Sequence, residues 1–139
     1  MKRRLCRPFV WLLPLLLGAA IAPIVSSHPS KLIKVSEISL RKLATKTVLP
    51  DFPEEAKKRG AKGVAVAQLE VDEKGDVAQV EVLEAPDPLI KKAVADATKQ
   101  WKFKPSASSG EPVRIQGKLT FYYVIDRNEA RVENPRQPK

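Results

Sequence analysis

Cysteine and histidine are nearly absent from this 139-residue chain, which has only Cys6 and His28, both close to its N-terminus. The rest of the chain therefore offers no disulfide and no thiolate or imidazole cluster for a metal. Nucleophilic or acid–base catalysis needs such groups, or two carboxylates in one cleft. The carboxylates here fall at expected helix starts, turns and outer faces of strands. We therefore expect no enzyme, no cofactor and no metal site.

Acidic residues are absent before Glu37, whereas four of the 25 basic residues lie among the first seven. Residues 28–139 thus carry 21 basic and 16 acidic side chains, a net charge of +5 against +9 for the whole chain. This net charge is spread over several predicted elements. This charge pattern gives no support for nucleic acid as a partner.

The N-terminal region has the layout of a secretory signal, with basic residues followed by an apolar, uncharged run over residues 9–25. A helix of this run would be about 25 Å long, against a hydrocarbon core of about 30 Å. Pro14 and Pro23 interrupt it further. We predict that residues 1–27 are a signal peptide cleaved near Ser27, with cleavage after Ala20 or an uncleaved signal-anchor helix as the alternatives. In both cases the remaining chain is exported.

Two short helices are predicted before the first strand. Residues 28–47 are expected to form a linker that contains the first of them, over residues 36–43, with Ser36 as its cap. The second lies in PDFPEEAKKRG, residues 50–60, where Pro53 suits the first helical position. Acidic residues begin this segment, basic residues end it, and Gly60 supplies a left-handed stop.

Alternating aliphatic residues over 64–71 and 77–83 predict a β-hairpin. Its turn, residues 72–76, contains Gly75, which is expected to adopt a positive φ. The three carboxylates of the turn lack the spacing of a twelve-residue calcium loop. Asp and Gly are ordinary turn residues, so these carboxylates are interpreted as part of the turn.

An amphipathic helix is predicted from Asp87, which can cap its first turn, with Pro88 at the first helical position. Apolar residues recur along it at spacings of three and four: Leu89, Ile90, Ala93, Val94, Ala97 and Trp101. Trp101 and Phe103 follow in the sequence WKFKP at a spacing of two. Both are predicted to be core aromatics, because a small domain needs large apolar side chains.

The strictest alternation in the chain runs from Val113 to Ile125 and predicts a long last strand with one exposed face. A polar turn over residues 106–112 precedes it. Residues 126–139 are polar, contain two prolines and are predicted to form a flexible tail.

Together these elements predict a small two-layer α+β domain over residues 48–125, a short helix followed by β-β-α-β. The helical crossover favours a third strand parallel to the second. The simplest arrangement is a three-stranded antiparallel or mixed sheet of order 2-1-3 with one covering helix. The last strand would then lie at an edge, with its outward N–H and C=O groups unpaired.

Several motifs occur in a fixed order between about Val48 and Ile125: PDFPEEAKKRGAKG, LEVDEKGDVAQVEVLE, the capped helix, WKFKP, GEPV and the closing strand. This ordered set resembles the C-terminal domain of TonB-family energy transducers, with Phe52-Pro53 in place of a Tyr-Pro pair. The resemblance implies the periplasm of a Gram-negative bacterium, with the domain secreted or tethered to the inner membrane by residues 9–25. It also implies binding to an extended segment of an outer-membrane transporter, and coupling to an inner-membrane proton-channel complex.

Two features depart from the family pattern. Family members have a long Pro-rich spacer, whereas only the 22 residues 28–49 separate Ser27 from Pro50. They also have a histidine in the membrane helix, and no ionisable residue lies between Phe9 and Ser27. A periplasmic scaffold or dimerisation domain without energy transduction is therefore the alternative function.

Peptide capture would use β-strand addition, in which main-chain hydrogen bonds give affinity and alternate side chains give selectivity. The candidate partner-binding residues are the aromatic–proline pair and the predicted edge strand: Phe52, Pro53, Gly117, Lys118, Leu119, Thr120, Phe121, Tyr122 and Tyr123. The charges of Arg114 and Lys118 could instead protect this edge against pairing. The resemblance favours binding, and a homodimer through the same edge stays open.

Overall fold

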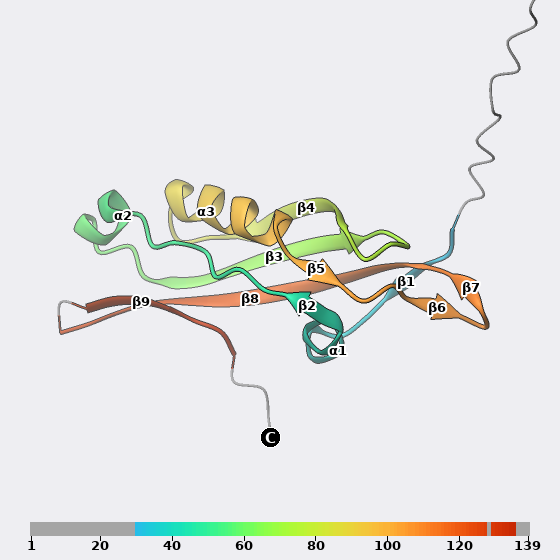
Figure 1. The fold of residues 1–139 in the computed structure, drawn as a ribbon. Helices are drawn as coiled ribbons and strands as arrows, with labels where there is room; N and C mark the ends of the chain where they lie inside the picture. Colours follow the sequence, from blue (N-terminus) through green and yellow to red (C-terminus); the bar gives the residue numbers. More distant parts are fainter. Residues whose placement is uncertain (1–29, 128, 136–139) are drawn as a thin grey trace, which may run out of the picture.

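The computed structural model describes residues 30–127 and 129–135. Its main sheet has five strands (Figure 1). Four of them lie in the order β1-β8-β3-β4, and the fifth, β9, also pairs with β8. The strands are β1 (Leu32–Lys34), β3 (Gly63–Val71), β4 (Val77–Glu84), β8 (Arg114–Asp126) and β9 (Glu129–Glu133). Two small sheets pair β2 (Ala44–Lys46) with β5 (Lys102–Phe103), and β6 (Ala107–Ser108) with β7 (Glu111–Pro112).

Three helices accompany the sheet: α1 (Glu37–Leu43), α2 (Glu54–Lys58) and α3 (Pro88–Lys99). Helix α3 packs against β3 and β4, whereas α1 lies beyond β8 on the side away from β3 (Figure 1). The predicted signal, residues 1–27, lies outside the described residues. Within the described part of the chain, no helix is long and apolar enough to cross a membrane.

The expected caps and turns form as the local sequence indicates. Ser36 caps α1 by accepting a hydrogen bond from the Ser39 N–H at 3.3 Å, and Asp87 caps α3 by accepting one from the Leu89 N–H at 2.8 Å. Gly60 ends α2 with φ +67°, and Gly75 has φ +94° in the hairpin turn. Glycine adopts a positive φ more easily than other residues, which explains why glycine occurs at both positions.

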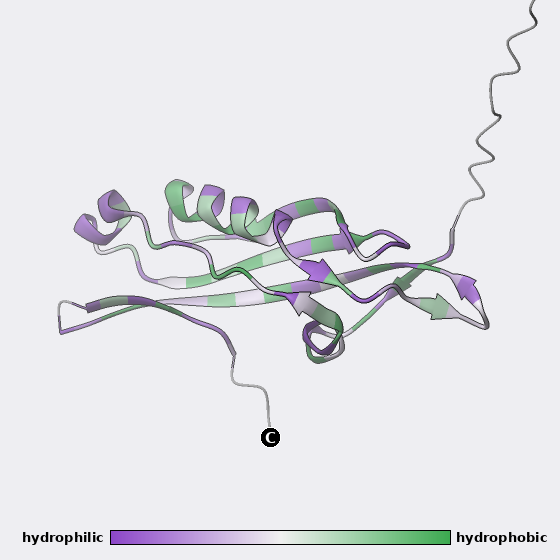
Figure 2. Ribbon diagram, in the orientation of Figure 1, coloured by the Kyte–Doolittle hydropathy of each residue, from purple (hydrophilic) through white to green (hydrophobic). Residues whose placement is uncertain are grey.

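The centre of the sheet agrees with the sequence-based expectation. Both β4 and β8 pair antiparallel with β3, so they run parallel to each other, as the crossover through α3 requires. The hydropathy alternates along β3 and β8, while α2 is largely hydrophilic (Figure 2). The alternation directs one side of each strand toward the core and leaves the other side exposed.

The sheet is nevertheless larger than the predicted three strands, and the prediction of a free outer edge on the last strand is wrong. Strand β1 pairs parallel with residues 114–116 of β8, and β9 pairs antiparallel with residues 122–126. Residues 129–133 had been expected to be part of a flexible tail. Their polar composition does not indicate a strand in the sequence. They can still form one, because pairing with a sheet edge uses main-chain groups and needs little apolar surface.

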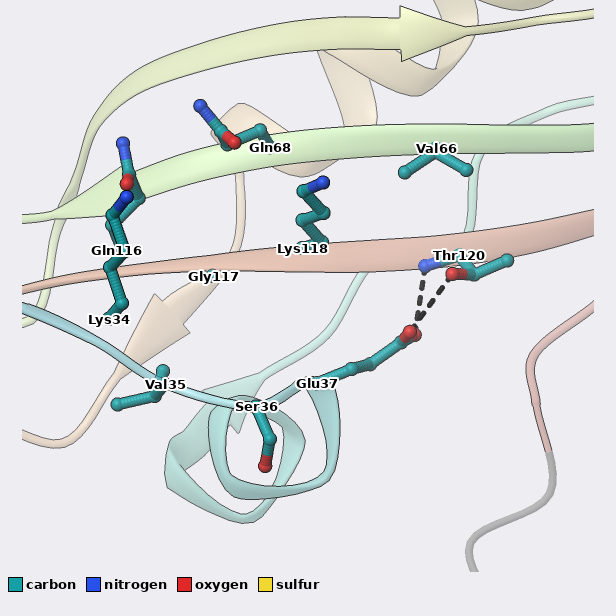
Figure 3. Close-up of a pocket in the computed structure, with 10 residues that line it drawn as sticks. All are labelled: Lys34, Val35, Ser36, Glu37, Val66, Gln68, Gln116, Gly117, Lys118 and Thr120. Atoms are coloured by element: carbon teal, nitrogen blue, oxygen red, sulfur yellow. Dashed lines mark hydrogen bonds between the residues drawn. The ribbon is translucent and has the colours of Figure 1, made fainter.

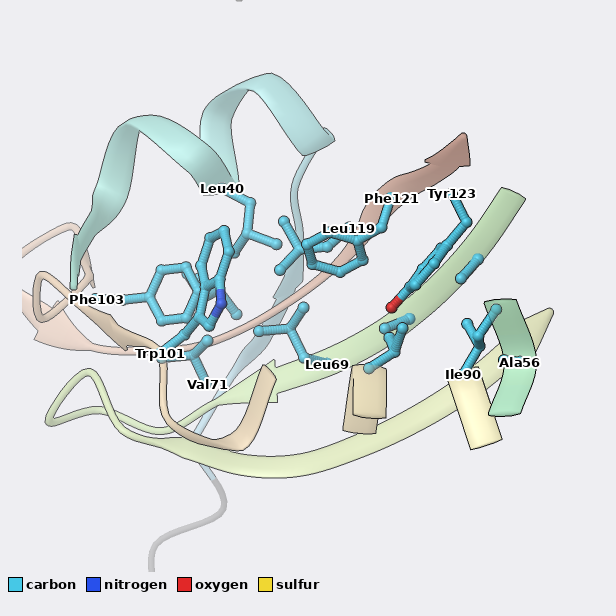
Figure 4. Packing of buried hydrophobic residues seen from close by; sticks show 14 of the residues in the cluster. Leu40, Ala56, Leu69, Val71, Ile90, Trp101, Phe103, Leu119, Phe121 and Tyr123 are labelled. Carbon is cyan, nitrogen blue, oxygen red and sulfur yellow. The ribbon is translucent and has the colours of Figure 1, made fainter. Parts of the chain in front are cut away.

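The core lies between α3, the buried face of the sheet and α1 (Figure 4). Trp101 is at its centre, stacked with Phe103 at 6.0 Å between ring centroids and edge-on to Phe121 at 6.3 Å. Its indole Nε1–H donates to the Val48 carbonyl oxygen at 2.8 Å. Leu40 of α1 reaches the same cluster and is fully buried. The prediction that Trp101 and Phe103 are core aromatics is confirmed.

Candidate functional site

The candidate residues 117–123 divide into two groups because successive side chains of β8 point to opposite faces. Leu119, Phe121 and Tyr123 are at most 2% exposed and help to build the core. The side chains of Lys118, Thr120 and Tyr122 lie on the other face, where Tyr122 is 40% exposed. Only this second group can present side chains to a partner.

The main-chain groups of the even-numbered residues of β8 point to the outer edge, away from β3. The Arg114 N–H donates to the Lys31 carbonyl at 3.0 Å, and the Val35 N–H donates to the Gln116 carbonyl at 2.8 Å. Hydrogen-bonding direction alternates along a strand with the same period as the side chains. The outward main-chain groups among the candidates are therefore those of Lys118, Thr120 and Tyr122.

Two side chains of α1, Glu37 and Arg41, bind the outward main-chain groups of Thr120, and Figure 3 shows the bonds made by Glu37. Glu37 Oε1 accepts from the Thr120 N–H at 2.8 Å, and Glu37 Oε2 accepts from the Thr120 hydroxyl at 2.9 Å. Arg41 Nη2 donates to the Thr120 carbonyl at 2.9 Å and to Glu37 Oε1 at 2.7 Å. We call this pair the Glu37/Arg41 clasp. It takes the place of a neighbouring strand at Thr120.

The clasp is itself held in the core. The Arg41 side chain is 7% exposed, and its guanidinium carbon lies 5.8 Å from the ring centroids of both Trp101 and Phe121. Cations near aromatic faces are attracted by the ring quadrupole, more strongly where water is excluded. Helix α1 is therefore anchored by both charge and packing.

Lys118 lies between the segments that cover the outer edge of β8, and none of these segments covers its outward main-chain groups. Strand β1 and Val35 reach as far as Gln116, the clasp takes Thr120, and β9 begins at Tyr122. No hydrogen bond from the described residues reaches the outward N–H and C=O of Lys118. Its side chain is exposed. The edge is thus open at one position.

A shallow groove of about 550 Å³ opens beside this gap (Figure 3). It is lined by side chains and main chain from β1, α1, β3 and β8: Lys34, Val35, Ser36, Glu37, Val66, Gln68, Gln116, Gly117, Lys118 and Thr120. Gly117 lets these elements approach closely, because a Cβ there would lie 2.8 Å from Leu40 Cδ2 and 3.3 Å from Val35 Cγ2. The groove has both polar and apolar walls and is open to solvent, which suits an extended segment better than a compact apolar ligand.

Phe52 and Pro53 lie away from the gap. Phe52 packs edge-to-face on Tyr123, with ring centroids 5.1 Å apart, and Pro53 precedes the first turn of α2. The Tyr123 hydroxyl donates to the Asp51 carbonyl at 3.4 Å, and burial, with a smaller effect of the Asp51 charge, raises the pKa of Tyr123. Tyr123 is five residues from Lys118, roughly 17 Å along the strand. The structure brings Phe52 to Tyr123 and not to the open edge.

Sequence reasoning missed Glu37 and Arg41. Their spacing of four on a predicted helix is visible, but such pairs are common on exposed helix surfaces. Their contact with Thr120 spans 83 residues for Glu37 and 79 for Arg41. Local periodicity carries no information about that distance in the chain, so no signal in the single sequence could have revealed the clasp.

The hairpin carboxylates and Asp87 have structural roles. Asp72 Oδ1 accepts from the main-chain N–H groups of Lys74 and Asp76, each at 2.9 Å. The Arg59 guanidinium, 2.8 Å from Asp87, and then the Leu89 N–H hold the pKa of Asp87 below its ordinary value. Among the residues that the structure describes, no three acidic, histidine or cysteine side chains gather where a metal ion could bind.

These observations define a class, a small α+β domain with a partly open sheet edge beside a groove. The family model described as Gram-negative bacterial TonB protein C-terminal matches residues 48–125, more than half of the chain, and the chain belongs to this family. The chain is also similar to the solution NMR structure of the Pseudomonas aeruginosa TonB C-terminal domain. That match has a TM-score of 0.52 and 25% identity, and covers 62% of this chain and 88% of that one. No curated protein matches the chain.

Family membership defines the function coarsely. The domain is a non-enzymatic protein-interaction module with a TonB-like role in outer-membrane transport, in the periplasm of a Gram-negative bacterium. The family engages outer-membrane transporters. Strand β1, the clasp residues of α1 and strand β9 all lie outside the matched residues 48–125. The covering of the β8 edge is therefore a feature of this chain beyond the matched domain.

Proposed function

We propose that this domain captures an extended segment of an outer-membrane transporter by adding it as a strand beside β8. One observation carries the proposal: the outward main-chain groups of Lys118 have no partner among the described residues, while the positions on both sides are covered. In strand addition, main-chain hydrogen bonds give affinity, and side chains at alternate positions give selectivity. The groove beside Lys118 gives the incoming side chains a place on the exposed face.

Lys118 alone cannot account for stable capture. Its two main-chain hydrogen bonds would contribute about 1–3 kcal/mol in total. A micromolar complex needs about 8 kcal/mol of binding free energy. The added segment must therefore also pair with neighbouring positions of β8, which requires that part of the present covering moves aside. Lys118 is the position at which pairing begins.

The test compares two substitutions at Lys118 in the full chain. Lys118→Pro removes the outward N–H and leaves the ladder to β3 intact, because the N–H of Lys118 does not point toward β3. Lys118→Ala removes the side chain and keeps the N–H. Synthetic peptides from periplasm-facing segments of outer-membrane transporters are titrated calorimetrically, and circular dichroism checks the fold of each variant.

We expect Lys118→Ala to bind close to the parent, and Lys118→Pro to stay folded and bind at least about tenfold more weakly, a loss of about 1.4 kcal/mol. A peptide methylated on alternate main-chain nitrogens provides a second test that leaves the protein unchanged. Two such peptides are compared, one methylated on the odd-numbered nitrogens and one on the even-numbered nitrogens. Methylation of the nitrogens that face β8 should abolish binding, and methylation of those that face away should not. Equal binding by both substituted proteins and by both methylated peptides would place capture elsewhere.

A further inference from the structure

We propose that β1 occupies the partner's docking site, so that the incoming segment exchanges with β1 and runs parallel to β8 along residues 114–118. The Glu37/Arg41 clasp stays in place and ends the added strand at Thr120. This inference rests on the proposed capture function and specifies its site, its strand direction and the pattern of its partner. The exchange requires that β1 leaves the β8 edge more easily than the other segments that cover it.

Strand β1 is the shortest of the covering segments. It pairs with β8 over three residues, whereas β9 pairs over five. Leu32 is 44% exposed, Lys34 is exposed, and only Ile33 is partly buried within β1. Local opening costs least where a segment buries few apolar contacts and its backbone hydrogen bonds are exposed. Of the two strands that cover the edge, β1 is therefore the one expected to leave first.

Helix α1 is anchored and does not need to leave with β1. Leu40 is fully buried in the core, and Arg41 is held by Glu37, Thr120 and two aromatic rings. Ser36 begins the helix with an N-cap hydrogen bond. The chain can therefore separate between Val35 and this cap. Once β1 and Val35 have moved, the main-chain groups of Arg114 and Gln116 become available next to Lys118.

The contacts of β1 describe the segment that would replace it. Ile33 lies opposite Ile115, whose side chain faces the core, and both Ile33 and Val35 pack against the core cluster. Leu32 and Lys34 lie opposite Arg114 and Gln116, on the other face. The site thus accepts an extended segment with two aliphatic side chains at alternate positions, parallel to β8. A polar residue between them fits beside the groove.

A reversible disulfide between β1 and β8 tests this exchange. Lys34→Cys and Gln116→Cys are introduced into the full chain with Cys6→Ser, because residues 34 and 116 are opposite partners in the parallel pair. Oxidation holds β1 in place, and reduction releases it. The matched control replaces Val124 and Arg131, opposite partners in β8 and β9, with cysteine. The probes are a fluorescent peptide of sequence SKLIKVS, residues 30–36 of this chain, and the best transporter peptide from the Lys118 experiment.

We expect both probes to bind the reduced β1 variant and to bind its oxidised form at least about tenfold more weakly, because a site that is rarely free lowers the apparent affinity in proportion. The oxidised β9 control should bind as its reduced form does. Failure of SKLIKVS to bind the reduced β1 variant would overturn the inference, since β1 would not be exchangeable.

The two proposals fail in different ways. If the transporter peptide binds the oxidised and reduced β1 variants equally, capture is real but β1 is not its competitor. If only the β9 disulfide abolishes binding, β9 is the segment that moves, and the β1 assignment is wrong. If SKLIKVS shows the expected exchange while no transporter peptide binds any variant, the edge is exchangeable and the proposed transporter partner is wrong.

Discussion

Replacing Trp101 by alanine should remove the largest single contribution to the core. Trp101 is 1% exposed, contacts two aromatic rings and lies beneath the Arg41 guanidinium. Truncation of a buried tryptophan costs roughly 3–5 kcal/mol through lost transfer free energy and the cavity that remains. A domain of ordinary stability has about 5–15 kcal/mol in total. We therefore expect Trp101→Ala to fold weakly or not at all.

A second variant separates the ring from its hydrogen bond. Trp101→Phe keeps an aromatic ring but loses the Nε1–H that donates to the Val48 carbonyl at 2.8 Å. A buried acceptor left without its donor costs about 1–3 kcal/mol. Loss of stability should therefore be intermediate in Trp101→Phe. Leu83→Ala is the matched control, because Leu83 is 46% exposed and its truncation should change the free energy of unfolding by no more than about 0.5 kcal/mol.

Urea unfolding followed by circular dichroism measures these effects. With a slope of about 2 kcal/mol per molar urea, a loss of 3–5 kcal/mol lowers the midpoint by roughly 2 M. The expected order of midpoints is parent, Leu83→Ala, Trp101→Phe and Trp101→Ala. A Trp101→Ala protein that unfolds within about 0.5 kcal/mol of the parent would show that Trp101 is not the centre of the core.

Three further predictions concern the clasp, the cap of α3 and the N-terminus. Glu37→Ala should lower the free energy of unfolding by roughly 2–3 kcal/mol, because it leaves a nearly buried arginine without its carboxylate partner. Glu54→Ala, at an exposed ion pair, should change the urea midpoint much less in the same experiment. Asp87→Asn keeps a capping oxygen and loses the charge that pairs with Arg59. Because folding lowers the pKa of Asp87, its charge stabilises the folded protein at neutral pH, and this stabilisation is lost as the carboxylate is protonated. The melting temperatures of parent and variant should therefore converge as the pH falls below about 4. Mass measurement of protein from a periplasmic fraction should give a mature chain beginning near His28, and an intact chain in the membrane pellet would instead indicate an anchor.

The sequence predicted the local elements well because each has a complete local signal. Asp87-Pro88 begins α3, Gly75 turns the hairpin, and the alternation of β3 and β8 identifies their buried faces. The helical crossover predicted that the strand after α3 runs parallel to β4, and therefore that β3 lies between β4 and β8. The prediction of a three-stranded sheet with one covering helix was incomplete, since β1, β9 and α1 also take part.

The candidate site was less predictable, because it depends on contacts between distant residues. Alternation showed that Lys118, Thr120 and Tyr122 share a face, but not that Thr120 is bound by a helix 79 to 83 residues earlier. A strand of three residues such as β1 has no measurable period. Composition also could not distinguish a polar edge strand at residues 129–133 from a flexible tail.

The boundary of the matched family region, Val48, does not coincide with the boundary of the folded unit. A fragment beginning there would lose β1, Leu40 and the clasp, and with them the covering of half of the β8 edge and of part of the aromatic core. Exposed strand edges beside apolar surface readily pair with other chains. Dimers or aggregates of such a fragment would then reflect where the chain had been cut, and the oligomeric state of the natural protein must be measured with residues 30–47 present.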